Sequence, residues 1–514
     1  MPFKKNRNIM KKYIFPTIAI AASLFLASCN HYDFDTDVED MSVSQGKANF
    51  SKYVALGNSL TSGYRDGTLY SDGQLESYPA MLASVMKKAG GAMDFKQPMI
   101  PNNIGGFQGL TGFPGKLTLQ VVNGSLTPVP SPAAAPLDNI SAGGPYQNLG
   151  VPGAKSFHLG LSNYGMLNPY YSRFSTGVSP VAAAVAQAPT FFSIWIGNND
   201  VLSYATSGGV GVDQTGNTNP ATYGSNDITD PNVLVGSITQ YVTALTANGA
   251  KGVIANIPNV STIPFFTTVP YNPLTKSVLG GGDEAIGQAN ITALNAQLYG
   301  PLKQALSAFG AGNRINLLSS TAPNPLLIKD VDLTDLSAQI TAALTPALGA
   351  PTAAAFGAIY GQARQATAKD MVLLTTRAII GSTAAGAPAS INKYGISYPL
   401  ENAHILSEVE TGRVLTATAA YNAGIKSLAS SKGLAFVDAN AKMNELASAS
   451  GITFDGVKFT TKFVTGGAFS LDGVHLTGKG YAIIANEFIK AINQKYQSTL
   501  PQVNIYNYSG VKFP

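Results

Sequence analysis

The sequence predicts an α/β protein built on a parallel sheet. Short apolar segments alternate along the chain with longer segments of helical periodicity, and strands separated by helices usually pair in parallel. Apolar residues make up 45% of the 514 residues and charged residues only 12%, so a large core is available. The 53 glycines and 30 prolines indicate many loops but remain below the roughly 25–30% that marks a low-complexity chain.

The expected strands are short and in most cases apolar, and helical segments separate most of them. They cover residues 52–56, 147–149, 191–196, 251–257, 315–318 and 434–437. The expected helices cover residues 76–89, 181–188, 233–248, 284–309, 333–368, 407–431 and 478–496. The first of these helices illustrates the reasoning, because Pro79 lies in its first turn and Leu82, Val85 and Met86 share one face.

The remaining segments are expected to form loops. Residues 96–145 are rich in Gly, Pro and Asn, and the pair Asn123-Gly124 predicts a β-hairpin within them. Residues 203–230 are polar, whereas residues 260–282 are apolar and interrupted by proline. The apolar loop, which contains Phe265 and Phe266, fits either an acyl-binding lip or an insertion packed on the body.

The N-terminus has the pattern of a targeting segment. Residues 4–12 are basic, and the apolar run that follows at 13–26 is too short to span a bilayer comfortably but suits a signal peptide. The run ends in Leu26-Ala27-Ser28-Cys29, which resembles a bacterial lipobox, where cleavage precedes an acylated cysteine. Cys29 is the only cysteine. We therefore expect residues 1–28 to be a lipoprotein signal peptide; a secretory signal with an incidental cysteine is the alternative.

An acidic segment follows the cysteine. Residues 29–50 are expected to form a flexible tether, and its first acidic residues are Asp33, Asp35, Asp37, Glu39 and Asp40. The segment resembles the export signals of surface lipoproteins in the Bacteroidetes, although a periplasmic tether would have the same composition. We expect an outer-membrane lipoprotein, with the membrane as a partner through lipidated Cys29 and an outward or periplasmic orientation left open.

Without its leader the chain is close to neutral. The net charge of +5 equals the contribution of the leader's five basic residues, Lys4, Lys5, Arg7, Lys11 and Lys12. A neutral body has no electrostatic footprint for nucleic acid. One cysteine and four histidines give little material for a metal site, so we expect neither metal nor cofactor. With no internal repeat, we expect one domain over 51–498 with insertions near 96–145 and 200–400, and a C-terminal tail over 499–514.

A candidate nucleophile lies in Gly57-Asn58-Ser59-Leu60, directly after the first expected strand. Ligands of open parallel sheets bind beyond the carboxyl ends of the strands. Gly57 and Gly63 allow a tight turn that exposes the Ser59 hydroxyl. A serine in a Gly-flanked loop is equally compatible with ordinary turn chemistry.

A candidate base lies in Asp472-Gly473-Val474-His475, just before the last expected helix. An aspartate three residues before a histidine can hold one imidazole nitrogen and leave the other to act as a general base. The same pair also fits a loop or capping arrangement.

Two further segments follow expected strands. In Gly197-Asn198-Asn199-Asp200, a side-chain amide could donate to a developing oxyanion. In the segment 148–154, Gly153 would let the backbone N–H approach a ligand. Trp195, two residues before Gly197, is expected to belong to the core near this site.

Together the four segments occur in the order of the blocks of the SGNH (GDSL-type) hydrolases, which this chain therefore resembles. Tyr78 and Pro79 extend the resemblance, whereas Asn58 replaces the usual Asp of the nucleophile block. The resemblance implies a three-layer α/β/α sandwich with a flavodoxin-like parallel sheet, to which this chain adds loop and helical insertions.

The resemblance also implies the role of each residue. Ser59 would be the nucleophile, His475 the base and then the acid, and Asp472 the group that orients the imidazole. The N–H groups of Ser59 and Gly153 and the amide of Asn199 would form the oxyanion hole. The reaction would be ester hydrolysis through an acyl-enzyme on a small-molecule, lipid or glycan ester. An acetyl esterase acting on glycans and a non-catalytic surface binding lipoprotein are the alternatives, and the oligomeric state is left open.

Overall fold

The computed structural model describes residues 42–92 and 94–514. The expected signal peptide, Cys29 and most of the acidic tether lie outside the described residues. Residues Ser44–Pro514 form one compact unit. None of the helices in the described ranges is both long enough and apolar enough to cross a membrane.

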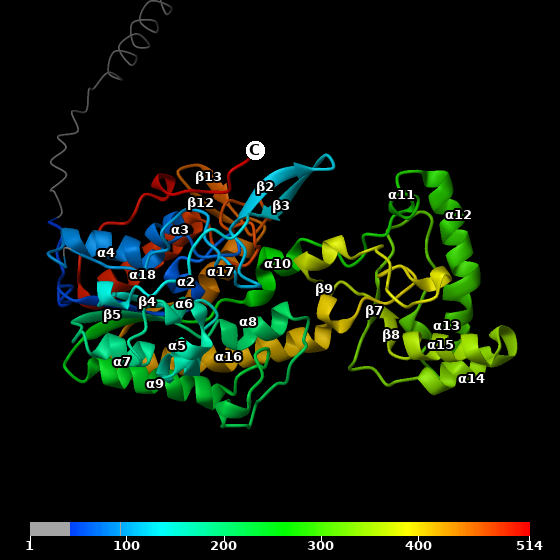
Figure 1. Ribbon diagram of the computed structural model, residues 1–514, viewed down its shortest axis with the longest axis horizontal. Helices are drawn as coiled ribbons and strands as arrows, with labels where there is room; N and C mark the ends of the chain where they lie inside the picture. The colour runs from blue at the N-terminus through cyan, green and yellow to red at the C-terminus, as the bar shows by residue number, and fades with distance from the viewer. Residues whose placement is uncertain (1–41, 93) are drawn as a thin grey trace, which may run out of the picture. The chain divides into compact units, whose positions relative to one another are not determined.

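The unit is built on a five-stranded parallel sheet (Figure 1). Its strands are β1 (Tyr53–Gly57), β4 (Asn148–Gly150), β5 (Phe191–Trp195), β6 (Lys251–Ala255) and β11 (Ala435–Val437). Their order across the sheet is β4-β1-β5-β6-β11, and every neighbouring pair is parallel. The order of the chain therefore reverses between β1 and β5. The α/β prediction is confirmed, and these five strands lie where the sequence predicts them.

Helices flank the sheet (Figure 1). α4 (Tyr78–Lys88) and α18 (Gly478–Tyr496) pack against each other, while α9 (Pro231–Thr246) packs against both α7 (Pro180–Val185) and α16 (Glu408–Ser431). Local sequence fixes where the longest of them begins. The hydroxyl of Ser407 caps α16 and the carboxylate of Glu410 caps the backbone of Ser407 in return, so two N–H groups are satisfied.

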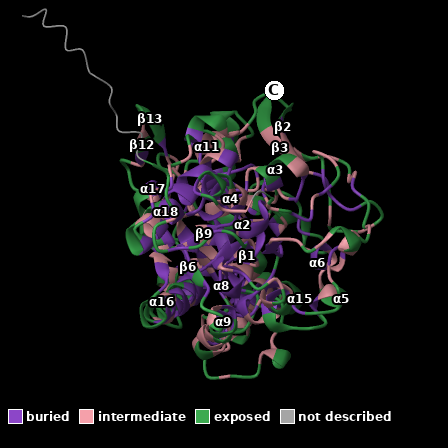
Figure 2. Cartoon of the chain, turned by 90° about the vertical axis from the view of Figure 1, so that its left-hand side faces the viewer, coloured by how far each residue is buried: buried purple, intermediate pink, exposed green. Residues whose placement is uncertain are grey.

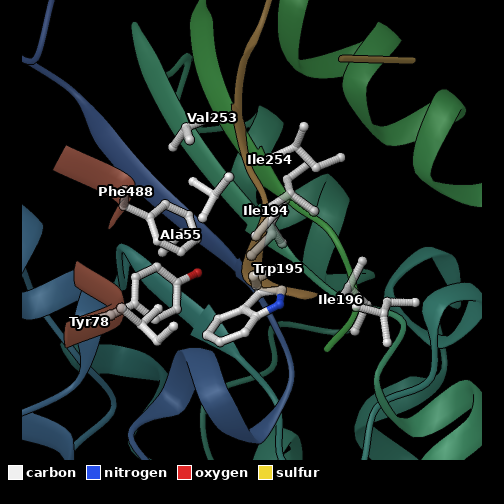
Figure 3. Packing of buried hydrophobic residues seen from close by; sticks show 14 of the residues in the cluster. Ala55, Tyr78, Ile194, Trp195, Ile196, Val253, Ile254 and Phe488 are labelled. Atoms are coloured by element: carbon white, nitrogen blue, oxygen red, sulfur yellow. The ribbon is translucent and has the colours of Figure 1, made fainter. Parts of the chain in front are cut away.

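The core lies between the sheet and these helices, as the buried strands β1 and β6 illustrate in Figure 2. Tyr78 stacks on Phe488 with ring centroids 4.6 Å apart, and Trp195 meets Tyr78 edge-on at 5.6 Å (Figure 3). Trp195 is fully buried, and its indole N–H donates to the carbonyl of Asn256 over 3.0 Å. Large aromatic side chains contribute much of the apolar area that stabilises a core. Trp195 therefore joins the core at the end of β5, as predicted.

The other elements belong to loops and insertions, and the predicted hairpin is present as β2 and β3. The remaining strands are β2 (Leu117–Val122), β3 (Ser125–Pro130), β7 (Leu327–Lys329), β8 (Ala363–Gln365), β9 (Met371–Val372), β10 (Ile405–Leu406), β12 (Ile452–Phe454) and β13 (Val457–Phe459). The remaining α-helices are α2 (Ser59–Ser62), α3 (Ser71–Leu75), α5 (Tyr164–Leu167), α6 (Pro169–Ser172), α8 (Asn199–Thr206), α10 (Pro264–Thr267), α11 (Lys276–Leu279), α12 (Glu284–Leu294), α13 (Gly300–Ser307), α14 (Ser337–Leu348), α15 (Ala350–Tyr360) and α17 (Ala439–Ala447).

The strand predicted at residues 315–318 is wrong. Ile315 and Leu318 are buried in a second core cluster together with side chains of α13 and α14, which explains the apolar pattern. The backbone N–H of Asn316 donates to the side chain of Gln365, and that of Leu318 donates to the side chain of Asn295. Side-chain oxygens thus accept the hydrogen bonds that these backbone N–H groups would otherwise donate to a neighbouring strand.

Some predicted helix boundaries also differ. The helix expected at 284–309 is α12 and α13 with a π-helical turn between them. The helix expected at 333–368 is interrupted at Gly349 between α14 and α15 and ends at Tyr360, and its last part is wrong because β8 lies there. Gly349 has a φ of +77°, which lies outside the right-handed helical region and so ends α14. Glycine adopts this φ without the steric cost that a side chain would add. α8 extends into the loop predicted at 203–230, and the short helices α10 and α11 lie within the loop predicted at 260–282.

Candidate active site

Ser59, His475 and Asp472 form one hydrogen-bonded line. His475 Nε2 lies 2.9 Å from Ser59 Oγ, and His475 Nδ1 lies 2.9 Å from Asp472 Oδ2. Ser59 is the first residue of α2 at the end of β1, whereas the other two lie in the loop before α18. The structure thus brings together three residues from the two ends of the unit. The order of contacts is that of a nucleophile, a base and an orienting carboxylate.

The turn that presents Ser59 is fixed by its neighbours. A Cβ atom at Gly57 would lie 2.0 Å from Thr61 Oγ1 and 2.4 Å from the carbonyl oxygen of Trp195, so no side chain fits there. Asn58 caps α2 by accepting a hydrogen bond from the N–H of Leu60, and its amide donates to the side chain of Asn198. Asn58 thereby connects the loop after β1 with the loop after β5.

The Asp472 carboxylate has an unusually full set of donors. Oδ1 accepts from the N–H groups of Val474 and His475 and from the Ser470 hydroxyl, while Oδ2 accepts from the N–H of Gly67 and faces the His475 ring. Burial by itself would raise the pKa of Asp472. The charge of His475 and the hydrogen bonds from its ring and backbone outweigh burial and hold that pKa well below its usual value. Asp472 is therefore ionised at neutral pH, where it can orient the imidazole.

Of the expected oxyanion donors, Asn199 lines the same cavity as Ser59. The Asn199 amide donates one hydrogen bond to the carbonyl of Ala154 over 2.9 Å, which leaves its second N–H unused by that bond. Gly153 precedes Ala154 and has a φ of +80°. Among the described residues, neither the N–H of Ser59 nor that of Gly153 has a hydrogen-bond acceptor. Free donors of this kind are what an oxyanion hole requires.

Asp200 is a positioning residue whose role the sequence alone did not indicate. Its fully buried carboxylate accepts hydrogen bonds from the N–H and the hydroxyl of Ser156 at 2.8 and 2.7 Å. Burial raises the pKa of Asp200, and the hydrogen bonds from Ser156 oppose that shift. Asn199 and Asp200 therefore bind the loop that carries Gly153 at two residues, Ala154 and Ser156. The motif contained the signal, since Asp200 directly follows Asn199.

Asp66 is a second positioning residue, and no sequence signal pointed to it. Its carboxylate accepts from the N–H of Leu471 over 3.0 Å and from the Tyr70 hydroxyl over 2.6 Å, while its own N–H donates to Ser470 Oγ. Together with the bond from Gly67 to Asp472, these contacts attach the loop after α2 to the loop that carries His475. The two loops are about 400 residues apart in the sequence.

A small cavity opens beside Ser59. It has a volume of about 40 Å³, and Ser59, Asn199 and His475 all line it. Gly153 is not one of its lining residues. A larger cavity of about 660 Å³ elsewhere in the unit contains none of the three site residues.

The apolar loop 260–282 contributes to the cavity only through its first residues. Val260 and Ile263 line the cavity, whereas Phe265 and Phe266 are buried in the main core. The N–H of Phe265 donates to the carbonyl of Gly473 over 2.9 Å. Of the two alternatives for Phe265 and Phe266, the packed insertion agrees with this placement, and the loop also supports the turn that carries His475.

His158 does not join the site. Its Nδ1 accepts from the N–H of Lys155, and its ring stacks on Tyr164 with centroids 4.9 Å apart. Burial, with a smaller effect of Lys155, lowers the pKa of His158 to about 4. Across residues 42–92 and 94–514, no three His, Cys, Asp or Glu side chains are grouped so that they could hold a metal ion.

Comparison of the chain with models of protein families, with curated proteins and with solved structures gives no significant match in any of the three. A function for this chain is therefore inferred from the side chains of the site and from their order in the sequence.

Proposed function

We propose that this chain is a serine ester hydrolase of the SGNH (GDSL-type) family that acts through an acyl-enzyme. The observation that carries the proposal is the line from Ser59 Oγ to His475 to Asp472, with two contacts of 2.9 Å. A hydroxyl that only caps a turn needs no imidazole, and an imidazole in a loop needs no carboxylate with so many donors. The combination supports nucleophilic catalysis over the alternative of a binding protein.

The mechanism follows from the geometry. His475 Nε2 takes the proton of Ser59 Oγ as the oxygen attacks the ester carbonyl carbon. The carbonyl oxygen becomes an oxyanion, which the N–H groups of Ser59 and Gly153 and the amide of Asn199 stabilise. The intermediate then collapses, the alkoxide leaves with the proton from His475, and the acyl group remains on Ser59. Water repeats these steps with the same base, which releases the carboxylic acid and restores Ser59.

The fold is consistent with the same family. Numbered along the chain, the five strands of the sheet have the order 2-1-3-4-5, which is the order of flavodoxin-like sheets. We propose that the sheet and its flanking helices form the three-layer α/β/α sandwich of the SGNH hydrolases. The reversal of order between β1 and β5 is where such sheets bind their ligands. Ser59 and Asn199 follow these two strands.

A fluorophosphonate probe tests the proposed activity, because it phosphonylates only an activated serine. The wild-type protein should be labelled, and Ser59→Ala should abolish labelling. Ser62→Ala is the matched control, since Ser62 is buried on the same short helix and contacts the site only by donating to the Ser59 carbonyl. A folded wild-type protein that resists the probe would favour a non-catalytic binding lipoprotein.

We also propose that the protein is an outer-membrane lipoprotein anchored through Cys29. The support is in the sequence, where the single cysteine directly follows an apolar segment of signal-peptide length. Cys29→Ser should leave the precursor uncleaved or release a soluble protein, as read from its mass and its partition into detergent. A variant processed and fractionated like the wild type would contradict the anchor.

A further inference from the structure

The cavity beside Ser59 is lined by a few polar side chains and by a larger number of apolar ones. The polar ones are Ser59, Asn198, Asn199 and His475. Of the described residues that line the cavity, His475 is the only one with a titratable side chain. The apolar wall includes Trp195, Val260, Ile263, Met443, Phe469 and Leu476, none of which is more than 5% exposed. Such a wall suits a hydrocarbon group and offers no partner for a charged or sugar group.

The volume limits what this cavity can hold. At about 40 Å³, it has room for three or four atoms, because one water-sized group needs roughly 10–15 Å³ on the same measure. The wall is also fixed in place, since the Trp195 indole donates to the Asn256 carbonyl and packs on Tyr78. Close-packed walls of this kind do not widen without cost. A chain longer than about four carbons would have to leave the cavity.

The two halves of an ester have different needs at such a site. The acyl group remains bound to Ser59 after the first step, whereas the alcohol must leave and water must take its place. A small, mostly apolar space beside Ser59 therefore suits the acyl group, and the open side of the site suits the alcohol.

From these observations we infer that the cavity is the acyl-binding site and that it selects esters of short carboxylic acids, with two to four carbons. The inference rests on the proposed ester hydrolase function and adds the substrate class. Simple short-chain esters and acetylated sugars share this acyl chemistry, whereas long-chain lipid esters do not.

The wild-type enzyme tests the inference directly. We would measure kcat/KM for p-nitrophenyl acetate, butyrate, octanoate and dodecanoate, in which the leaving group is constant. We expect a rise from acetate to butyrate of up to about fourfold per added methylene, and octanoate at least tenfold below butyrate. A kcat/KM for octanoate or dodecanoate that equals or exceeds that for butyrate would overturn the inference.

Two variants test whether the cavity wall sets the limit. Met443→Ala removes buried wall, and Leu202→Ala opens the same cavity at a partly exposed residue of α8 that is less critical for folding. In each variant, kcat/KM for octanoate divided by kcat/KM for butyrate should rise at least tenfold. Met86→Ala is the matched control, because Met86 is equally buried in the same core cluster but does not line the cavity. The ratio should be unchanged in this control, and equal changes in all three variants would overturn the inference.

The remaining outcomes separate the inference from the function on which it rests. If Ser59 is labelled by the fluorophosphonate probe but long-chain esters are preferred, the hydrolase proposal stands and the short-acyl inference fails. If neither labelling nor hydrolysis of any ester occurs, both fail. A series of acetate esters with increasingly large alcohols provides the last arm. A rate that depends on alcohol size but not on acyl length would place the alcohol in the cavity and overturn the inference.

Discussion

Replacing Asp472 by asparagine separates the charge and acceptor capacity of this residue from its shape. The carboxylate offers two acceptor oxygens, of which Oδ1 receives three hydrogen bonds and Oδ2 receives one from Gly67 and faces His475 Nδ1. An asparagine has only one acceptor oxygen. Placing that oxygen at the Oδ1 position keeps the three bonds, so the new amide group is expected to face the imidazole.

That arrangement reverses the tautomer of His475. An amide N–H that points at Nδ1 requires Nδ1 to be the acceptor, so the ring proton moves to Nε2. The nitrogen that lies 2.9 Å from Ser59 Oγ can then no longer take the serine proton. In a Ser-His-Asp triad this change lowers kcat about 10⁴-fold, which corresponds to about 5.4 kcal/mol of activation free energy.

The assay is kcat for p-nitrophenyl acetate, with circular dichroism to show that the variant is folded. Asp66→Asn is the matched control, because Asp66 lies on the facing loop and its hydrogen bonds go to Leu471, Ser470 and Tyr70, not to the His475 ring. We expect it to lower kcat less than about tenfold, because the asparagine oxygen can keep the bond from Leu471 and the backbone N–H still reaches Ser470, so that only the bond from Tyr70 is lost. A folded Asp472→Asn protein within tenfold of the wild type, or an equal loss in Asp66→Asn, would refute the assigned role.

Three further predictions concern the neighbouring residues. Asn199→Ala should lower kcat about 10²–10³-fold with little change in KM, whereas Asn58→Asp should change kcat less than about tenfold because this side chain transfers no proton; a harmless Asn199→Ala together with a crippling Asn58→Asp would invert the roles. Asp200→Ala leaves the donors of Ser156 without their acceptor, so urea denaturation should show a loss of about 1–3 kcal/mol, together with a lower kcat; full activity would show that the Gly153 loop needs no such support. Because the fold lowers the pKa of Asp472, its stabilisation is complete above the unfolded value of about 3.9 and is lost as the pH falls toward the folded value. The stability difference between wild type and Asp472→Asn should therefore stay constant from pH 7 to about pH 5 and shrink as the pH falls below about 4, and a difference that stays constant down to pH 2 would contradict this account.

The sheet could be predicted because its signals are local. Four of its strands are short and mostly apolar, whereas β4 is Asn-Leu-Gly. β1 and β4 each end in a glycine, and Gly197 follows β5 by two residues. The segment at 315–318 has the same apolar pattern, but side chains of Asn295 and Gln365 occupy its backbone N–H groups. Those two residues are 23 and 49 positions away from their partners. No property of the segment itself distinguishes it from a strand.

The candidate site could be predicted in part for the same reason. Ser59, Gly153 and Asn199 are recognisable from their own short motifs and from the strands that precede them. The contacts that position these residues are not local. Asp66 meets Leu471 across 405 positions of sequence, and an aspartate in a turn has many ordinary uses. Its role emerges only when the two loops are seen side by side.

The division between local and distant signals reflects how the site is assembled. Gly57, at the end of β1, is in register with Gly150 of β4 and with Trp195 of β5. The loops that carry Ser59, Gly153 and Asn199 therefore begin at the same level, and the pairing of the strands itself brings these three loops to one edge of the sheet.

The loop of His475 has no such register, because it precedes α18 and belongs to none of the sheet strands. It must be held by explicit hydrogen bonds, and the contacts from Asp66 and Gly67 supply them. Loosening these bonds should displace the base while leaving the oxyanion donors in place. The placement of His475, rather than that of Ser59, is therefore the part of this site most exposed to substitutions far from it in the sequence.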